Sequence, residues 1–283
     1  MKYAITGATG NFGQSAVKAL VDKVNASSVI AIARNAEKAE KLLPVGVEIR
    51  VADYNNEESL EKAFVDVDKL LFISSQPGGE VSRDKQHENV VTALKNAGVN
   101  YVAYTSFPKA DISKAGLAID HRLTEKMIKE SGVAHSFLRN NWYLENEAAF
   151  LQSGAAGQTA TYWANGTAGW ALEREFAQAA VNVLTSDNAK ETYEFSGPAR
   201  TYKDLGQALK EAIGKDFEIK QVTEYEYTAL LEKTGLPHDV SAMYASFQEP
   251  IDDGSLTNAS TDLENILGSL TPLTEAIKEI LAH

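Results

Sequence analysis

Short apolar runs alternate with amphipathic stretches through the first half of the chain. The runs lie at residues 2–6, 28–33, 47–51, 69–74, 101–105 and 134–138, and each is nearly continuous in apolar character. Strands that are covered on both faces of a sheet require such continuity. The runs therefore predict six buried β-strands.

The stretches between these strands have the spacing of helices. Residues 12–24 carry a single apolar stripe, and further helices are expected near 36–43, 57–64, 84–97 and 119–131. Gly98 and Gly132 each follow a helix and suit C-terminal caps. The alternation predicts an α/β fold with a Rossmann-type, doubly wound parallel sheet. Its ligand crevice should lie at the carboxyl ends of the strands.

The regular alternation of strands and helices ends after residue 139. Residues 153–169 are rich in glycine, alanine and threonine, and we interpret them as a loop with a short strand. A helix at 173–184 and a strand at 192–196 should follow, and then helices at 202–212, 224–233, 240–247 and 272–281. We predict a Rossmann domain over 1–139, joined by part of 173–200, and a smaller, mostly helical lobe over 140–283.

Composition narrows the classes of protein. The 283 residues are 44% apolar, which suffices for a sizeable core, and they include no cysteine, which excludes disulfides and thiolate sites. A net charge of −12 without a dense basic cluster argues against a nucleic-acid partner. No segment resembles a signal peptide or approaches the ~18 apolar residues of a spanning helix. We therefore expect a cytoplasmic protein without a membrane partner; a homodimer is left open.

A glycine-rich turn joins the first strand to the first helix. It reads Gly7-Ala8-Thr9-Gly10-Asn11-Phe12-Gly13. Gly7 permits the tight turn, Gly10 lets the backbone approach a pyrophosphate, and Gly13 allows close packing of helix on sheet. The backbone amides at the start of the helix, together with the helix dipole, then bind the negatively charged pyrophosphate. The flanking strand and helix favour a dinucleotide site over a turn that merely needs positive φ.

Arg34 follows the second strand, where an NAD-preferring fold usually has an acidic residue. A guanidinium binds a ribose 2′-phosphate bidentately, so the sequence favours NADP(H), with a solvated surface arginine as the alternative. Asp53, after the third strand, could accept a hydrogen bond from the adenine amino group, cap a helix or simply stabilise the loop. Ser74, Ser75 and Gln76 end the fourth strand beside the expected cofactor path.

Several segments together resemble a known family. They read TGATGNFG, AIARN, ADY, LLFISS, YTS, HRLTEKMI and RNNWYLEN. The chain resembles the NmrA-like, atypical short-chain dehydrogenases, and within them the bacterial NADPH:quinone oxidoreductases and triphenylmethane reductase. The resemblance implies that the cofactor is held by Thr6, Gly7, Ala8, Thr9, Gly10, Asn11, Arg34, Ser74, Ser75, Gln76, Arg139, Asn140, Asn141, Trp142, Tyr143, Leu144 and Arg174. The 140–283 lobe would bind the substrate.

The usual proton donor of short-chain dehydrogenases is missing. That donor is a tyrosine four residues before a lysine, but Arg122 precedes Lys126 at this spacing. Quinones and cationic dyes accept hydride readily and need orientation more than acid catalysis. Charge on a quinone oxygen could be stabilised by Lys126, His121 or a water. Either residue could instead be an ordinary polar residue of its helix.

The segment after the sixth strand suggests a wall for flat molecules. Trp142 and Tyr143 follow two asparagines, and aromatic rings beside amides suit a nicotinamide and a planar acceptor. Alternatively, the two rings pack between the lobes and hold them together. We find no Ser/His/Asp arrangement and no metal-ligand spacing among the histidines.

Two functional hypotheses follow. The first is an NADPH-dependent reductase of quinones or similar planar acceptors, acting by direct hydride transfer without flavin. The second is an NADP(H)-binding redox sensor that has a protein partner and no turnover. A third, weaker hypothesis is a reductase of another carbonyl substrate with a relocated acid.

Overall fold

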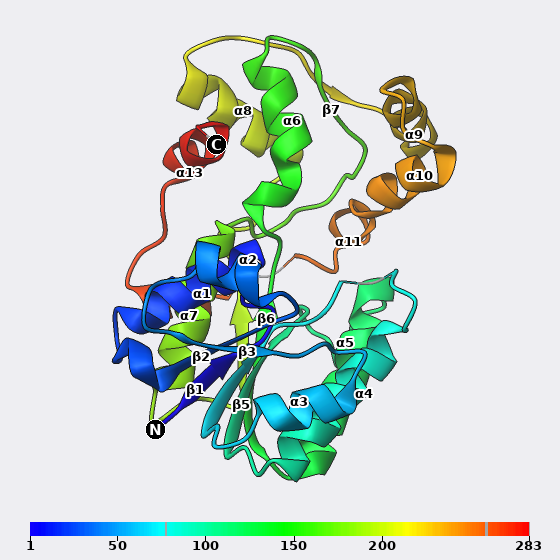
Figure 1. Cartoon of the computed structure of the whole chain (residues 1–283). Coiled ribbons are helices and arrows are strands. Elements are labelled where there is room, and N and C mark those ends of the chain that lie inside the picture. Colours follow the sequence, from blue (N-terminus) through cyan, green and yellow to red (C-terminus); the bar gives the residue numbers. More distant parts are fainter. Residues whose placement is uncertain (77, 258–259, 283) are drawn as a thin grey trace.

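The computed structural model describes residues 1–76, 78–257 and 260–282. A parallel sheet with helices on both faces forms the larger part, and the remaining helices gather into a smaller part beyond one edge of it (Figure 1). No helix within these described ranges is long and apolar enough to cross a lipid bilayer.

The predicted strands form one parallel sheet. It contains β1 (Tyr3–Ile5), β2 (Val29–Ala33), β3 (Glu48–Val51), β4 (Lys69–Phe72), β5 (Tyr101–Ser106), β6 (Ala134–Asn140) and β8 (Thr192–Phe195). The order is β3-β2-β1-β4-β5-β6-β8, so the direction of winding reverses between β1 and β4. This confirms the doubly wound α/β fold and places the ligand crevice beside β1 and β4.

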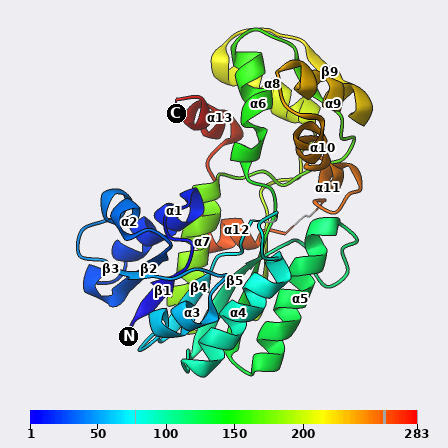
Figure 2. The same ribbon diagram turned by 45° about the vertical axis from the view of Figure 1, so that its right-hand side comes forward.

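Helices cover the sheet on both faces. One face carries α1 (Asn11–Val21), α2 (Ala36–Leu42), α7 (Glu173–Thr185) and α12 (Asp262–Leu267), around a core that includes Phe12, Leu20 and Phe176. The other carries α3 (Glu57–Ala63), α4 (Arg83–Asn96) and α5 (Gly116–Ser131), around Phe64, Phe72 and Phe137. Figure 2 shows the two helical layers on either side of the strands. A single-turn helix, η1 (Ala26–Ser28), precedes β2.

The smaller part has its own core. It contains η2 (Leu144–Glu147), α6 (Ala148–Ala155), α8 (Tyr202–Ile213), α9 (Glu224–Lys233), α10 (His238–Ser246), α11 (Glu249–Asp252), α13 (Leu273–Leu281) and a two-stranded sheet of β7 (Ala160–Tyr162) and β9 (Ile219–Gln221). Tyr162 and Tyr202 stack at its centre, with ring centroids 4.8 Å apart. The chain returns to the larger part at α7 and β8, which continue the main sheet and its helical layer.

The loop predicted over residues 153–169 begins too early. Residues 153–155 are helical and form the end of α6. A Cβ on Gly154 would lie 2.6 Å from Leu209 Cδ2, so this glycine lets α8 approach the helix closely. Tertiary packing here outweighs the low helix propensity of glycine.

Candidate active site

A cavity of about 740 Å³ lies along the carboxyl ends of the central strands. This volume falls within the usual range for small-molecule sites. Most predicted site residues line it: Gly7, Thr9, Gly10, Asn11, Phe12, Gly13, Arg34, Asp53, Ser74, Ser75, Gln76, His121, Asn140, Asn141, Trp142 and Tyr143. The fold therefore brings together segments that are far apart in sequence.

The glycine-rich turn is built as expected, with one difference. Gly7 has φ +60°, a conformation that side chains rarely adopt. A Cβ on Gly13 would lie 2.2 Å from the carbonyl oxygen of Gly7, so this glycine packs α1 against the turn itself. The first turn of α1 carries no acidic side chain of its own, and this suits anion binding.

A carboxylate from another helix already lies at this anion site. Glu173, the first residue of α7, lines the cavity and accepts a hydrogen bond from the Phe12 backbone N–H. Burial, and then the neighbouring Glu145, raise the pKa of Glu173 to about 7. The Glu173 backbone N–H donates to both Glu145 carboxylate oxygens, at 3.0 and 2.9 Å. Our sequence prediction did not include Glu173.

Arg34 and Asp53 line the adenosine end expected from the fold. Arg34 is exposed at the cavity, and no ion pair to it is found within residues 1–76, 78–257 and 260–282. The Asp53 carboxylate accepts the backbone N–H of Asn55 at 2.9 Å. Asn56 caps α3, so the alternative of Asp53 as the helix cap is wrong.

Two neighbouring asparagines differ in what their amides can still bind. All hydrogen bonds of the Asn141 amide go to the protein: its oxygen accepts from Trp142 and Gly169, and its nitrogen donates to Leu256. Asn140 donates to the Tyr143 hydroxyl at 3.1 Å, but its buried Oδ1 has no donor in the part of the chain that the structure describes. An amide N–H of a ligand in the cavity would satisfy this oxygen.

The two aromatic residues both line the cavity and pack against the cores. Trp142 lines the cavity while it packs against the core of the smaller part. The Tyr143 ring lies 6.0 Å from Phe12 and 5.2 Å from Phe176 and also lines the cavity. Trp142 thus packs on the smaller part and Tyr143 on the larger part, and both border the cavity.

Three predicted residues lie beneath the cavity and do not line it. Thr6, Ala8 and Leu144 are fully buried. Thr6 Oγ1 accepts from the Tyr54 hydroxyl at 2.5 Å and from the Ile73 backbone N–H at 3.0 Å. These residues support the floor of the site. Because they are buried, the prediction that they contact the cofactor directly is corrected.

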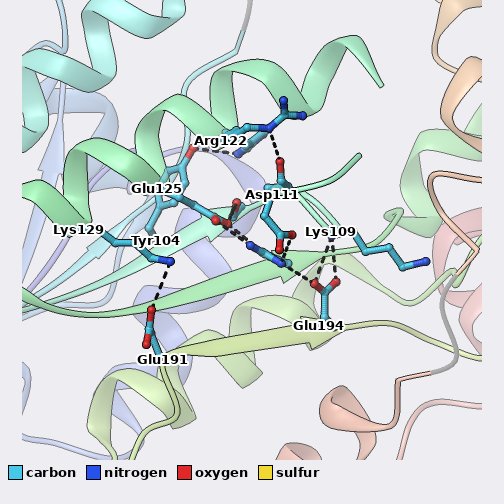
Figure 3. Close-up of polar contacts among 12 residues, drawn as sticks. Tyr104, Lys109, Asp111, Arg122, Glu125, Lys129, Glu191 and Glu194 are labelled. Carbon is cyan, nitrogen blue, oxygen red and sulfur yellow. Dashed lines mark hydrogen bonds and ion pairs between the residues drawn. The ribbon is translucent and has the colours of Figure 1, made fainter. Parts of the chain in front are cut away.

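Arg139 also requires correction. Its guanidinium forms paired hydrogen bonds with Glu125 at 2.9 and 2.8 Å, and also contacts Asp111 at 2.8 Å and Glu194 at 3.0 Å. Figure 3 shows Glu125, Asp111 and Glu194 converging from different elements. With its donors turned to these carboxylates, Arg139 does not line the cavity. The arrangement indicates a structural role.

Lys126 and Arg174 likewise lie off the cavity. The Lys126 side chain is 68% exposed and its ammonium is 3.7 Å from Glu130, so it cannot stabilise an oxygen inside the site. Arg174 forms a salt bridge with Glu279 at 2.6 Å and donates to Thr271. Arg174 therefore connects α7 to the C-terminal helix.

A buried hydrogen-bond network lies behind the part of the cavity that Arg83 and His121 line. His121 Nδ1 lies 2.9 Å from the Tyr104 hydroxyl, and His121 Nε2 lies 3.1 Å from Arg83 Nη2. His87 is bonded to Ser75 and to Thr124. Burial, and then the charge of Arg83, hold the pKa of His121 well below its usual range, so this imidazole is neutral.

Sequence reasoning missed Arg83 and His87. They lie four residues apart, and so on one face, at the start of the helix that follows Ser74–Gln76. That spacing beside a strand end was an available signal. Their connection to His121, thirty-odd residues further along, was visible only in the fold.

Comparison with known proteins identifies the group to which this architecture belongs. A family of NAD(P)H-binding proteins matches residues 7–168. Quinone oxidoreductase 2 of Escherichia coli is 36% identical, over 98% of both chains. The Citrobacter triphenylmethane reductase, solved with NADP(H), has a TM-score of 0.93 and 37% identity, covering 99% of this chain and 100% of its own. The NADPH complex of the E. coli quinone oxidoreductase has a TM-score of 0.91 and 36% identity, covering 99% of each chain. These matches confirm the resemblance drawn from the sequence.

Proposed function

The chain belongs to the NAD(P)H-binding family, and on that premise we propose that it is an NADPH-dependent reductase. It passes hydride directly to quinones or similar planar electron acceptors. The carrying observation is one continuous cavity that reaches from Arg34, past the start of α1, to the aromatic wall at Trp142 and Tyr143. Its charged, anion-binding and flat regions follow the order of the chemical groups along NADPH.

The residues present fit that cofactor. The amides at the start of α1 would hold the pyrophosphate, Arg34 would hold the 2′-phosphate, and the unpaired Asn140 Oδ1 would accept from the nicotinamide carboxamide. Bound NADPH supplies the hydride. The chain orients the acceptor on the aromatic wall and excludes water from the reacting face.

The experiment is a stopped-flow assay of NADPH absorbance with a panel of quinones and cationic dyes. Loss of absorbance that requires both enzyme and acceptor, at lower concentrations of NADPH than of NADH, is the expected result. Constant absorbance across the panel would sink the proposal. Calorimetry would then test the sensor hypothesis, because a sensor should distinguish NADPH from NADP⁺ and bind a partner accordingly.

A further inference from the structure

A buried cation, Arg83, lines the cavity away from Arg34. Arg83 is the first residue of α4, and its side chain is only 8% exposed. It contacts His121 of α5, which in turn contacts Tyr104 of β5. The sheet order places β5 across the β1–β4 switch from β2, whose last residue precedes Arg34. Arg83 therefore lies at the opposite half of the cavity from the adenosine end.

The charge of Arg83 is incompletely balanced by the chain. Its nearest carboxylate is Asp120, with Nη1 to Oδ2 at 3.9 Å. One nitrogen, Nη2, bonds to His121, while the buried Nε has no acceptor among the described residues. A buried cation without close carboxylates is costly unless another group supplies negative charge. The cavity beside it is open to such a group.

The hydrogen-bond directions assign the roles of Arg83 and His121. A guanidinium can only donate, so His121 Nε2 must be the acceptor, and the imidazole proton lies on Nδ1 towards Tyr104. His121 then has neither a positive charge nor a proton to offer the cavity from Nε2. This corrects the predicted role of His121 as a direct stabiliser of charge.

We propose that Arg83 contacts the acceptor oxygen and stabilises the negative charge that forms on it, while His121 is a positioning residue that holds the guanidinium. This inference rests on the proposed function and specifies its substrate class. The favoured acceptors are those whose oxygen becomes anionic on reduction.

Hydride transfer breaks a C–H bond of NADPH, which is oxidised to NADP⁺, and forms an O–H bond at one quinone oxygen. The two electrons reduce the ring and leave the other oxygen anionic, so the first product is the hydroquinone monoanion. Arg83 stabilises this anion and stays protonated, and a proton from solvent completes the hydroquinone. A cationic triphenylmethane dye differs, since hydride addition to its central carbon gives a neutral product and no oxygen anion. Arg83 should therefore assist quinones and give no assistance to such dyes.

The test compares the two acceptor classes in Arg83→Gln. We expect hydride transfer to a quinone to slow by about 100- to 1000-fold, as for loss of an oxyanion-stabilising donor. The rate of dye reduction should not fall together with the quinone rate, and it also tests folding, because a misfolded variant would reduce neither acceptor. Arg83→Lys should recover part of the quinone rate, because it restores charge without the planar geometry. Lys85→Gln removes an exposed cation from the same helix and should change nothing.

A binding measurement gives a readout independent of turnover. 4-Nitrophenol absorbs at longer wavelength as its phenolate, so a titration with NADPH-loaded protein reports which form binds. Wild type should bind the phenolate and lower the apparent pKa of the probe, and Arg83→Gln should not. Equal binding by both proteins, or equal losses of quinone and dye rates, would overturn the role of Arg83. If the wild type reduces no quinone, the proposed function itself fails.

Discussion

Two buried arginines near the carboxyl edge of the sheet differ in how their charge is balanced. Arg139 has three carboxylates within 3.0 Å and lies off the cavity. Arg83 has one carboxylate, at 3.9 Å, and lines the cavity. The first site is closed around its charge, while the second leaves part of the charge for something else.

The comparison separates charges that hold the fold from charges that await a ligand. A buried ion whose partners come from the chain is costly to break, because each partner is then left without compensation. A buried ion with too few partners costs stability in the free protein and gains its compensation on binding. A buried charge that lines a cavity and has too few partners in the chain is therefore a candidate for function.

The largest expected effect is on Arg139. Replacing it in Arg139→Met leaves Glu125 buried without a cation, and the free energy of unfolding should fall by about 3–5 kcal/mol. Urea denaturation measures this. Lys129→Met is the control, because it breaks an exposed pair with Glu191 and a cation–π contact with Phe137 and should cost about 1 kcal/mol or less. A small loss in Arg139→Met would erase the contrast between the two arginines.

Arg34 should have the next largest effect, on cofactor choice. Arg34→Gln removes a charged donor from the 2′-phosphate, which is worth about 1.5–3 kcal/mol, so NADPH affinity should fall by roughly 10- to 150-fold. NADH affinity should hardly change, because NADH lacks that phosphate. Lys38→Gln, which removes an exposed cation from α2, is the control. A parallel loss for both cofactors would contradict the proposed 2′-phosphate contact.

The sequence predicts local features well and side-chain direction poorly. The glycine turn and the six strands depend on nearby residues, and the structure confirms them. Arg139 and Asn140 are adjacent, but side chains alternate along a strand, so only Asn140 faces the cavity. Contacts between distant segments, such as Arg83 with His121, cannot be inferred from spacing alone.

Lys126 shows the same limit on a helix. One residue earlier, Glu125 is buried against Arg139, while Lys126 is exposed. Successive residues on a helix are turned by about 100°, so a shift of one position changes the environment completely. The family resemblance points to the helix, but the buried side of that helix depends on its packing against β6.

Arg83→Gln should have little effect on stability, which sharpens the contrast with Arg139. The variant loses a hydrogen bond to His121 but also removes an incompletely paired buried charge. We expect the free energy of unfolding to change by about 1 kcal/mol or less. Thermal and urea unfolding without cofactor would check this. A loss as large as that of Arg139→Met would mean that Arg83 is structural.

The smallest expected effect concerns Glu173, an acid whose charge opposes the ligand. Its pKa of about 7 means that it is mostly protonated below that pH and ionised above it. Only the ionised carboxylate carries the negative charge that repels the cofactor pyrophosphate at the start of α1. Arg174, Glu145, Glu175 and Glu279 are charged groups on or beside α7.

Glu173→Gln should therefore bind NADPH roughly 2- to 5-fold more tightly than wild type at about pH 8, and equally at about pH 6. Fluorescence titration of both proteins gives this ratio, in which the titration of the cofactor's own phosphate cancels. Glu147→Gln is the matched control: burial also raises the pKa of Glu147 to about 7, but it bonds to Tyr202 and Trp170 away from the cavity. A pH-independent ratio for Glu173→Gln would show that this carboxylate does not oppose the cofactor, and the contrast between paired and unpaired charges would then rest on the arginines alone.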